Sequence, residues 1–106
     1  MLEMNLVRVE EESGRKHEVY EIGEYTVYVT IYGDDTKIIS VSTNIGADEY
    51  MPDIFFEDGR FGSMEKKFKI QTTSYGALDT EEIKKFMEAY KKAINVVDIL
   101  TKELIA

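Results

Sequence analysis

The last quarter of the chain contains one long amphipathic stretch, from Leu78 to Ile105, which needs an apolar surface to lie on. Its apolar residues recur at steps of three and four, the spacing that places side chains on one face of an α-helix. The predicted buried face consists of Ile83, Phe86, Met87, Tyr90, Ala93, Ile94, Val97, Leu100 and Leu104. We therefore expect one helix over residues 79–105, lying on a sheet formed by residues 1–79.

The beginning of this helix is marked by a capping box. The Asp79 side chain is placed to accept a hydrogen bond from the backbone N–H of Glu82, and Glu82 is placed to reach back to Asp79. Farther along, Ala89, Val96 and Ile99 widen the apolar stripe beyond one contact seam. Either the sheet cradles the helix deeply, or a spare flank meets a second copy of the chain, so a homodimer is one open alternative.

Five segments before the helix have strand character: residues 6–12, 17–22, 25–32, 37–44 and 66–74. The clearest is 25–32, which is built almost wholly from aromatic and β-branched residues. Its alternation predicts that Tyr25, Val27, Val29 and Ile31 face the helix. We expect a single α+β domain over residues 1–106: an antiparallel meander of about five strands with one long C-terminal helix packed on one face.

Residues 45–64 break the strand pattern and mix aromatic with acidic residues. Asp58-Gly59 favours a small hairpin, and the alternative is that the aromatic residues close the edge of the core under a long loop. Long connections are often functional, so an interaction loop is predicted here.

The net charge of −8 is unevenly distributed along the chain. Residues 80–106 hold five lysines and five acidic residues, whereas residues 1–79 hold eight Lys and Arg against sixteen Asp and Glu. Such a surface repels nucleic acid, so no direct nucleic-acid binding is expected. The same field steers the chain toward a protein with a basic surface, including a groove that normally holds nucleic acid. The alternative is that the charge only keeps the domain in solution.

The acidic and loop segments supply the predicted partner-binding residues. These are Glu10, Glu11, Glu12, Asp48, Glu49, Tyr50, Asp53, Arg60 and Phe61. The chain has no cysteine, no apolar run of the roughly 18 residues that a membrane span needs, and no signal-peptide pattern at its N-terminus. A cytoplasmic protein that does not bind membranes is the expectation from these features.

No pattern in the sequence indicates catalysis or a cofactor site. Tyr32-Gly33-Asp34-Asp35 spells the metal-binding YGDD string of palm-domain polymerases, but Gly-Asp-Asp-Thr also suits a hairpin turn. The single histidine, His17, lacks the partners that a nucleophilic or metal site requires. We expect a non-enzymatic chain without catalytic or metal-binding residues. Alternatives are a metal-binding protein or metal-assisted enzyme using Asp34 and Asp35, a small-ligand binder with a pocket lined by Tyr28, Tyr32 and the phenylalanines, or a homodimeric accessory protein.

Residues 68–104 have a strand–helix ending whose junction is Tyr75-Gly76-Ala77-Leu78-Asp79-Thr80-Glu81-Glu82. This plan resembles small accessory proteins of bacteriophages and mobile elements, of the anti-CRISPR kind. The resemblance carries no catalytic or binding signature, so it transfers no functional residue. It implies a small acidic inhibitor that occupies the nucleic-acid groove of a partner protein.

Overall fold

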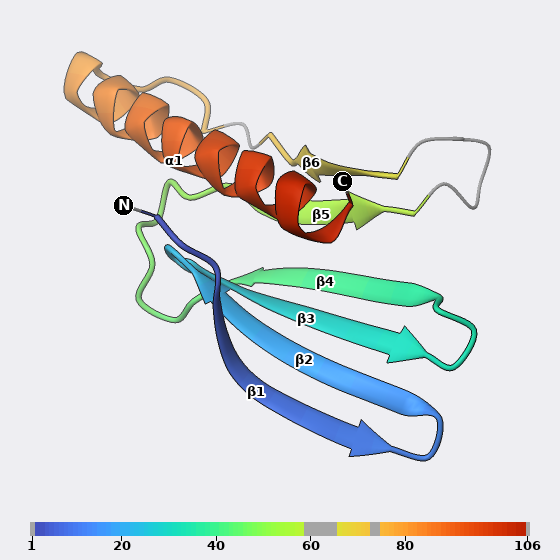
Figure 1. The fold of residues 1–106 in the computed structure, drawn as a ribbon. Coiled ribbons are helices and arrows are strands. Elements are labelled where there is room, and N and C mark those ends of the chain that lie inside the picture. The colour runs from blue at the N-terminus through green and yellow to red at the C-terminus, as the bar shows by residue number, and fades with distance from the viewer. Residues whose placement is uncertain (1, 59–65, 73–74, 106) are drawn as a thin grey trace.

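The computed structural model describes residues 2–58, 66–72 and 75–105, and shows an α+β fold (Figure 1). The elements are β1 (Asn5–Glu12), β2 (Arg15–Ile22), β3 (Tyr25–Tyr32), β4 (Lys37–Thr43), β5 (Ile54–Glu57), β6 (Lys67–Ile70) and α1 (Thr80–Leu104). Strands β1 to β4 form an antiparallel sheet in chain order, and β5 and β6 form a separate antiparallel pair. The predicted fold class is confirmed. The sixth strand pairs with β5 and does not extend the four-stranded meander.

The core lies between the four-stranded sheet, the β5–β6 pair and α1. Tyr25, Val27 and Val29 of β3 are buried as predicted, while Tyr28 between them is 44% exposed. Figure 1 shows α1 and the β5–β6 pair on the same side of the larger sheet, with the far half of β1 most distant from them. The sheet side of the core is Ile22, Tyr25, Val27, Val29 and Ile39, and the rest is Tyr50, Met51, Ile54, Phe68, Ala89, Ala93, Val96 and Leu100.

The buried face of α1 is rotated relative to the predicted one. Its fully buried residues are Ala89, Ala93, Val96 and Leu100, of which Ala93 and Leu100 were predicted. The prediction was wrong for three residues, which remain largely exposed: Ile83 (43%), Met87 (54%) and Ile94 (51%). The two alanines explain the rotation, because their small side chains let the helix backbone lie close to the core. The bulkier flank is left facing outward.

The capping box is confirmed at the beginning of α1. The backbone N–H of Glu82 donates to Oδ1 of Asp79 over 2.9 Å, and the backbone N–H of Asp79 donates to Oε1 of Glu82 over 3.2 Å. Two of the orphan donors at this helix end are thereby satisfied. Among the described residues, no helix is both long enough and apolar enough to cross a membrane.

The segment between β4 and β5 is tied to the core by hydrogen bonds. The hydroxyl of buried Tyr25 donates to the carbonyl oxygen of Pro52 over 2.6 Å, and the N–H of Gln71 donates to the carbonyl oxygen of Asp53 over 2.9 Å. At its start, the N–H of Asn44 donates to the carbonyl oxygen of Glu24 over 2.8 Å. These bonds fix the described part of the predicted interaction loop against the β2–β3 turn and β6.

Candidate functional site

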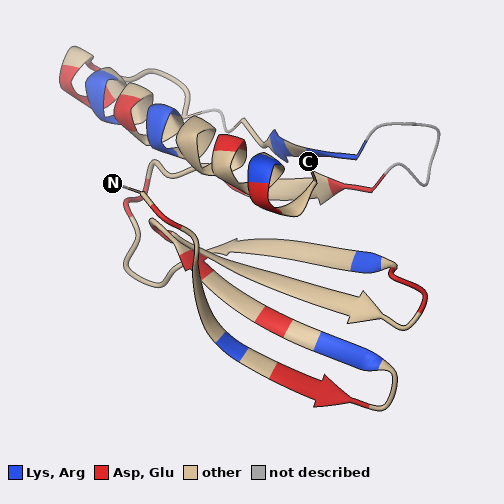
Figure 2. Ribbon diagram, viewed as in Figure 1, with Lys and Arg blue, Asp and Glu red and all other residues tan. Residues whose placement is uncertain are grey.

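The three consecutive glutamates of β1 face a run of basic residues on β2. In the antiparallel register Glu12 lies opposite Arg15, Glu11 opposite Lys16, and Glu10 opposite His17. Figure 2 shows the glutamates at the end of β1 beside the basic residues at the beginning of β2. Opposite charges on paired strands stabilise the pairing. The register thus places two of the three glutamates opposite a lysine or arginine of the same hairpin.

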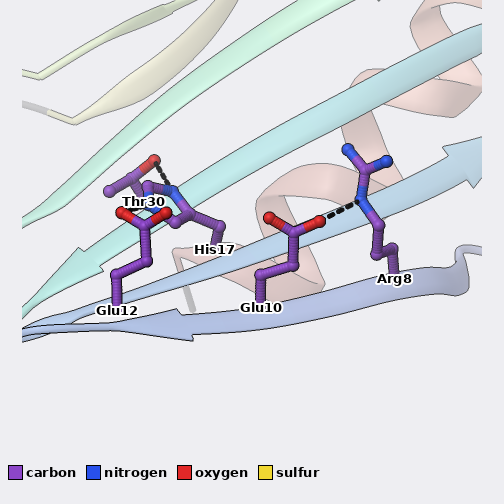
Figure 3. Close-up of polar contacts among 5 residues, drawn as sticks. All are labelled: Arg8, Glu10, Glu12, His17 and Thr30. Carbon is purple, nitrogen blue, oxygen red and sulfur yellow. Dashed lines mark hydrogen bonds and ion pairs between the residues drawn. The ribbon is translucent and has the colours of Figure 1, made fainter.

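Side-chain contacts on this face involve two of the three glutamates (Figure 3). Nε of Arg8 lies 3.2 Å from Oε1 of Glu10, and Nε2 of His17 lies 3.9 Å from Oε2 of Glu12. The other ring nitrogen of His17, Nδ1, is hydrogen-bonded to Oγ1 of Thr30 at 3.1 Å. Of the three glutamates, Glu10 thus has an arginine partner and Glu12 contacts a histidine, whereas Glu11 is in no ion pair with a described residue.

Tyr28 and Tyr32, considered for a small-ligand pocket, have different surroundings. Tyr28 lines a shallow groove beside Arg8, Glu10 and Glu12. The guanidinium of Arg15 lies over the ring of Tyr32, 5.9 Å from its centroid. The groove residues do not include Tyr32.

A second group of carboxylates lies where the β2–β3 turn meets the segment between β4 and β5. Asp48, Glu49 and Asp53 are exposed, and Glu24 in the turn is half-buried. Oε1 of Glu24 accepts a hydrogen bond from the backbone N–H of Asp48 over 3.1 Å, which joins the two segments. None of these four side chains is in an ion pair with a lysine or arginine of the described residues. We call Glu24, Asp48, Glu49 and Asp53 the acidic end.

The pKa values of two tyrosines report the electrostatic field at the acidic end. Burial is the main cause of the raised pKa of the Tyr25 hydroxyl, and the charges of Asp53 and Glu24 raise it further. The pKa of Tyr50 is raised by desolvation first and then by Glu82 and Glu49. In both cases the carboxylates oppose formation of another negative charge. Asp53 and Glu24 thus act on Tyr25, and Glu49 acts on Tyr50.

The acidic end also contains a buried polar atom, Oε2 of Glu24. This oxygen is buried and accepts no hydrogen bond from any described residue. A buried carboxylate oxygen is costly to leave without a donor. Glu24 therefore joins the two segments through Oε1 and carries an unsatisfied oxygen, Oε2, inside the acidic end.

Of the predicted binding residues, Tyr50 is the one that the structure moves away from the surface. It is only 8% exposed, its hydroxyl donates to Oε2 of Glu82 over 3.3 Å, and its ring makes an edge contact with Tyr75 at 5.4 Å. Tyr50 therefore holds the loop to α1 and presents little surface to a partner. Arg60 and Phe61 lie outside the described residues.

Ile45 is a candidate that the sequence analysis missed. It is fully exposed, at 106% of its reference area, and lies in the same short segment as Asp48 and Glu49. A turn in which the N–H of Ala47 donates to the carbonyl oxygen of Asn44 over 3.1 Å holds this segment. The available signal was an isolated isoleucine between a strand and acidic residues. An exposed aliphatic side chain beside unpaired carboxylates is suited to a partner pocket with a basic rim.

Asp34 and Asp35 form the β3–β4 turn. Oδ1 of Asp34 accepts from the backbone N–H of Thr36 over 3.1 Å, and this hydrogen bonding to Thr36 lowers the pKa of Asp34. The N–H of Asp35 donates to the carbonyl oxygen of Tyr32 over 2.9 Å. The described residues contain no group of three or more His, Cys, Asp or Glu side chains placed to hold a metal ion. Asp34 and Asp35 thus form a hairpin turn, as the turn interpretation of YGDD predicts, and the metal alternative stays a prediction.

Comparisons with known proteins do not place the chain in a family: no family model, curated protein or solved structure matches it.

Proposed function

We propose that this chain is a non-enzymatic protein-binding module that docks on a basic partner surface with its acidic end. The observation that carries the proposal is the concentration of carboxylates without ion-pair partners among the described residues, beside the fully exposed Ile45. The glutamates of β1 lie opposite Arg15, Lys16 and His17 of β2 and are not part of the proposed surface. The homodimer expected as an alternative would use a different surface, on α1.

The proposed interface combines an electrostatic and an apolar part. Carboxylates at an interface increase the association rate and select basic partners, whereas affinity comes mostly from a few well-buried anchors. Ile45 is the anchor in this arrangement, and the exposed carboxylates of Asp48, Glu49 and Asp53 supply the charge near it. If the basic surface is the nucleic-acid groove of another protein, the bound module is a competitive inhibitor of that groove.

The test is affinity capture of tagged protein from a lysate of the source cell, after nuclease treatment, at about 0.1 M and about 0.5 M salt. Two charge-reversal variants are compared with the wild type: Glu49→Lys/Asp53→Lys at the acidic end, and Glu88→Lys/Glu103→Lys on α1. Both change the net charge equally, and all four positions are exposed. We keep Asp48 unchanged because its side chain accepts from the backbone N–H of Tyr50.

We expect the wild type and the α1 variant to retain the same protein, and the acidic-end variant to lose it. Retained protein should leave at the higher salt concentration. An Ile45→Ser variant should weaken capture without changing its salt dependence, because it removes apolar contact only. Equal retention by both charge-reversal variants would refute the acidic end as the binding surface.

A further inference from the structure

The outward flank of α1 carries an apolar seam that the core covers only in part, since Val97 also packs against the core. It consists of Ile83, Met87, Tyr90, Ile94 and Val97, which we call the α1 seam. Ile83, Met87 and Ile94 are 43%, 54% and 51% exposed, and the other two are half-buried. Alternating steps of four and three are the spacing at which one helix packs along another. The seam therefore has the pattern of a helix–helix contact.

Aromatic packing supports the N-terminal half of the seam. The rings of Phe86 and Tyr90 are stacked with centroids 4.4 Å apart, and Tyr75 makes an edge contact with Phe86 at 5.7 Å. Because Tyr90 is held in this way, its ring is ordered before any partner arrives. Pre-ordered side chains lower the entropy cost of association.

The charge distribution favours a second copy of the chain as the occupant. Acidic and basic residues alternate along α1, as Figure 2 shows, and residues 80–106 are neutral overall. The excess of eight negative charges lies entirely in residues 1–79. Two copies that meet through α1 bring together their neutral surfaces. Contact through the acidic ends would instead bring like charges together.

We propose that the protein forms a homodimer in which the two α1 helices pack antiparallel along the α1 seam. Antiparallel packing sets Met87 against Val97 of the second copy and Tyr90 against its Ile94. One exposed side of the seam carries Lys84, Lys91 and Asp98, in that order. The antiparallel arrangement brings Lys84 close to Asp98 of the second copy, and it does so twice by symmetry. A parallel arrangement forms neither of these Lys84–Asp98 pairs.

Lys91 lies between Lys84 and Asp98 on that side of the seam and faces Lys91 of the second copy in the dimer. Within each copy, Nζ of Lys91 lies 3.6 Å from Oε1 of Glu88, which offsets the repulsion. The dimer leaves both acidic ends open, since none of their residues belongs to the seam. This inference is independent of the proposed function, and either can fail alone.

The test is sedimentation equilibrium of the full chain across about a hundredfold range of concentration. Two variants with the same charge change are compared: Met87→Lys/Ile94→Lys in the seam, and Glu103→Lys, an exposed position outside it. We expect a wild-type monomer–dimer equilibrium, a monomeric seam variant, and a dimerising control. Because Met87 and Ile94 are largely exposed, all three proteins should have the same far-ultraviolet circular dichroism. A monomeric wild type, or a seam variant that still dimerises, would overturn the proposal.

The Lys84–Asp98 contact distinguishes the antiparallel geometry. Lys84→Asp or Asp98→Lys alone should raise the dimer dissociation constant by about three- to tenfold, since each replaces two attractions by repulsions. The double variant Lys84→Asp/Asp98→Lys should restore the dimer. Additive weakening in the double variant would contradict this geometry.

Discussion

At the scale of single residues, Asp35 has the least favourable backbone conformation of the described non-glycine residues. Its φ is 66°, and no other described non-glycine residue has a positive φ. Aspartate tolerates the left-handed region better than alanine does, but only glycine enters it without steric cost. We expect Asp35→Gly to raise the free energy of unfolding by about 0.5 kcal/mol and Asp35→Ala to lower it by a similar amount. Urea unfolding of both variants checks this order, and a glycine variant less stable than the alanine variant would contradict it.

The raised pKa of Tyr25 predicts how the stability of the protein changes at alkaline pH. Because burial, Asp53 and Glu24 raise its pKa above the ordinary value of 10.0, ionisation is harder in the folded chain than in the unfolded one. Its contribution is fully present below about pH 10 and is lost as the pH rises above that value. Tyr25→Phe should lower stability by about 1 kcal/mol at neutral pH, because the Pro52 carbonyl loses its donor. Above pH 10 the variant should lose stability less steeply than the wild type. Urea midpoints from pH 7 to 11 test this, and parallel curves would contradict the assignment.

The environments of individual site residues were difficult to predict from the sequence. Tyr50 and Ile45 both stand in an acidic loop, and composition suggested exposure for the tyrosine and gave no role to the isoleucine. The structure reverses their environments, because Tyr50 reaches Glu82 on α1 whereas Ile45 lies outside every packed element. Such environments depend on contacts between segments far apart in the sequence, which local patterns do not record.

At the scale of secondary-structure elements, the β1–β2 hairpin and the acidic end respond oppositely to removal of a carboxylate. Glu11 lies opposite Lys16, so Glu11→Gln should lower the free energy of unfolding by a few tenths of a kcal/mol. Glu49 has no ion-pair partner among the described residues, so the matched variant Glu49→Gln should leave stability unchanged or raise it. Thermal unfolding of the two variants measures the difference. If Glu11→Gln is instead the stabilising change, the glutamates of β1 repel one another more than they are neutralised.

Elements with strong local signals were predicted well from the sequence. The four strands of the larger sheet begin and end within about two residues of their predicted bounds, and the Asp79 cap is where the capping pattern placed it. The pairing of β6 with β5 was harder to predict, because short strands carry little information about their neighbours. The buried face of α1 was ambiguous for a different reason. Its apolar stripe is so wide that Ala89 and Ala93, rather than the largest side chains, decide which part meets the core.

At the scale of the whole molecule, the net charge acts locally more than as one field. The chain measures 52 × 33 × 21 Å, whereas the electrostatic screening length at physiological salt is about 8 Å. Carboxylates at opposite ends therefore interact little in the cell. Those of the acidic end lie on adjoining segments and retain their mutual repulsion. Net charge alone thus says less about binding than the place where the unpaired carboxylates gather.

Because the charges act over short distances, the acidic end should govern how the stability of the protein depends on salt. Raising the salt concentration from about 0.01 M to about 0.15 M shortens the screening length from about 30 Å to about 8 Å and should stabilise the wild type by weakening repulsion. Glu49→Lys/Asp53→Lys should lose most of that response, because it removes repulsion at the acidic end. Glu88→Lys/Glu103→Lys has the same net charge and should retain the response. Urea midpoints at the two salt concentrations, measured below the concentration at which any dimer forms, compare the three proteins. Equal responses of the two variants would mean that total charge, rather than the acidic end, sets the electrostatic cost of folding.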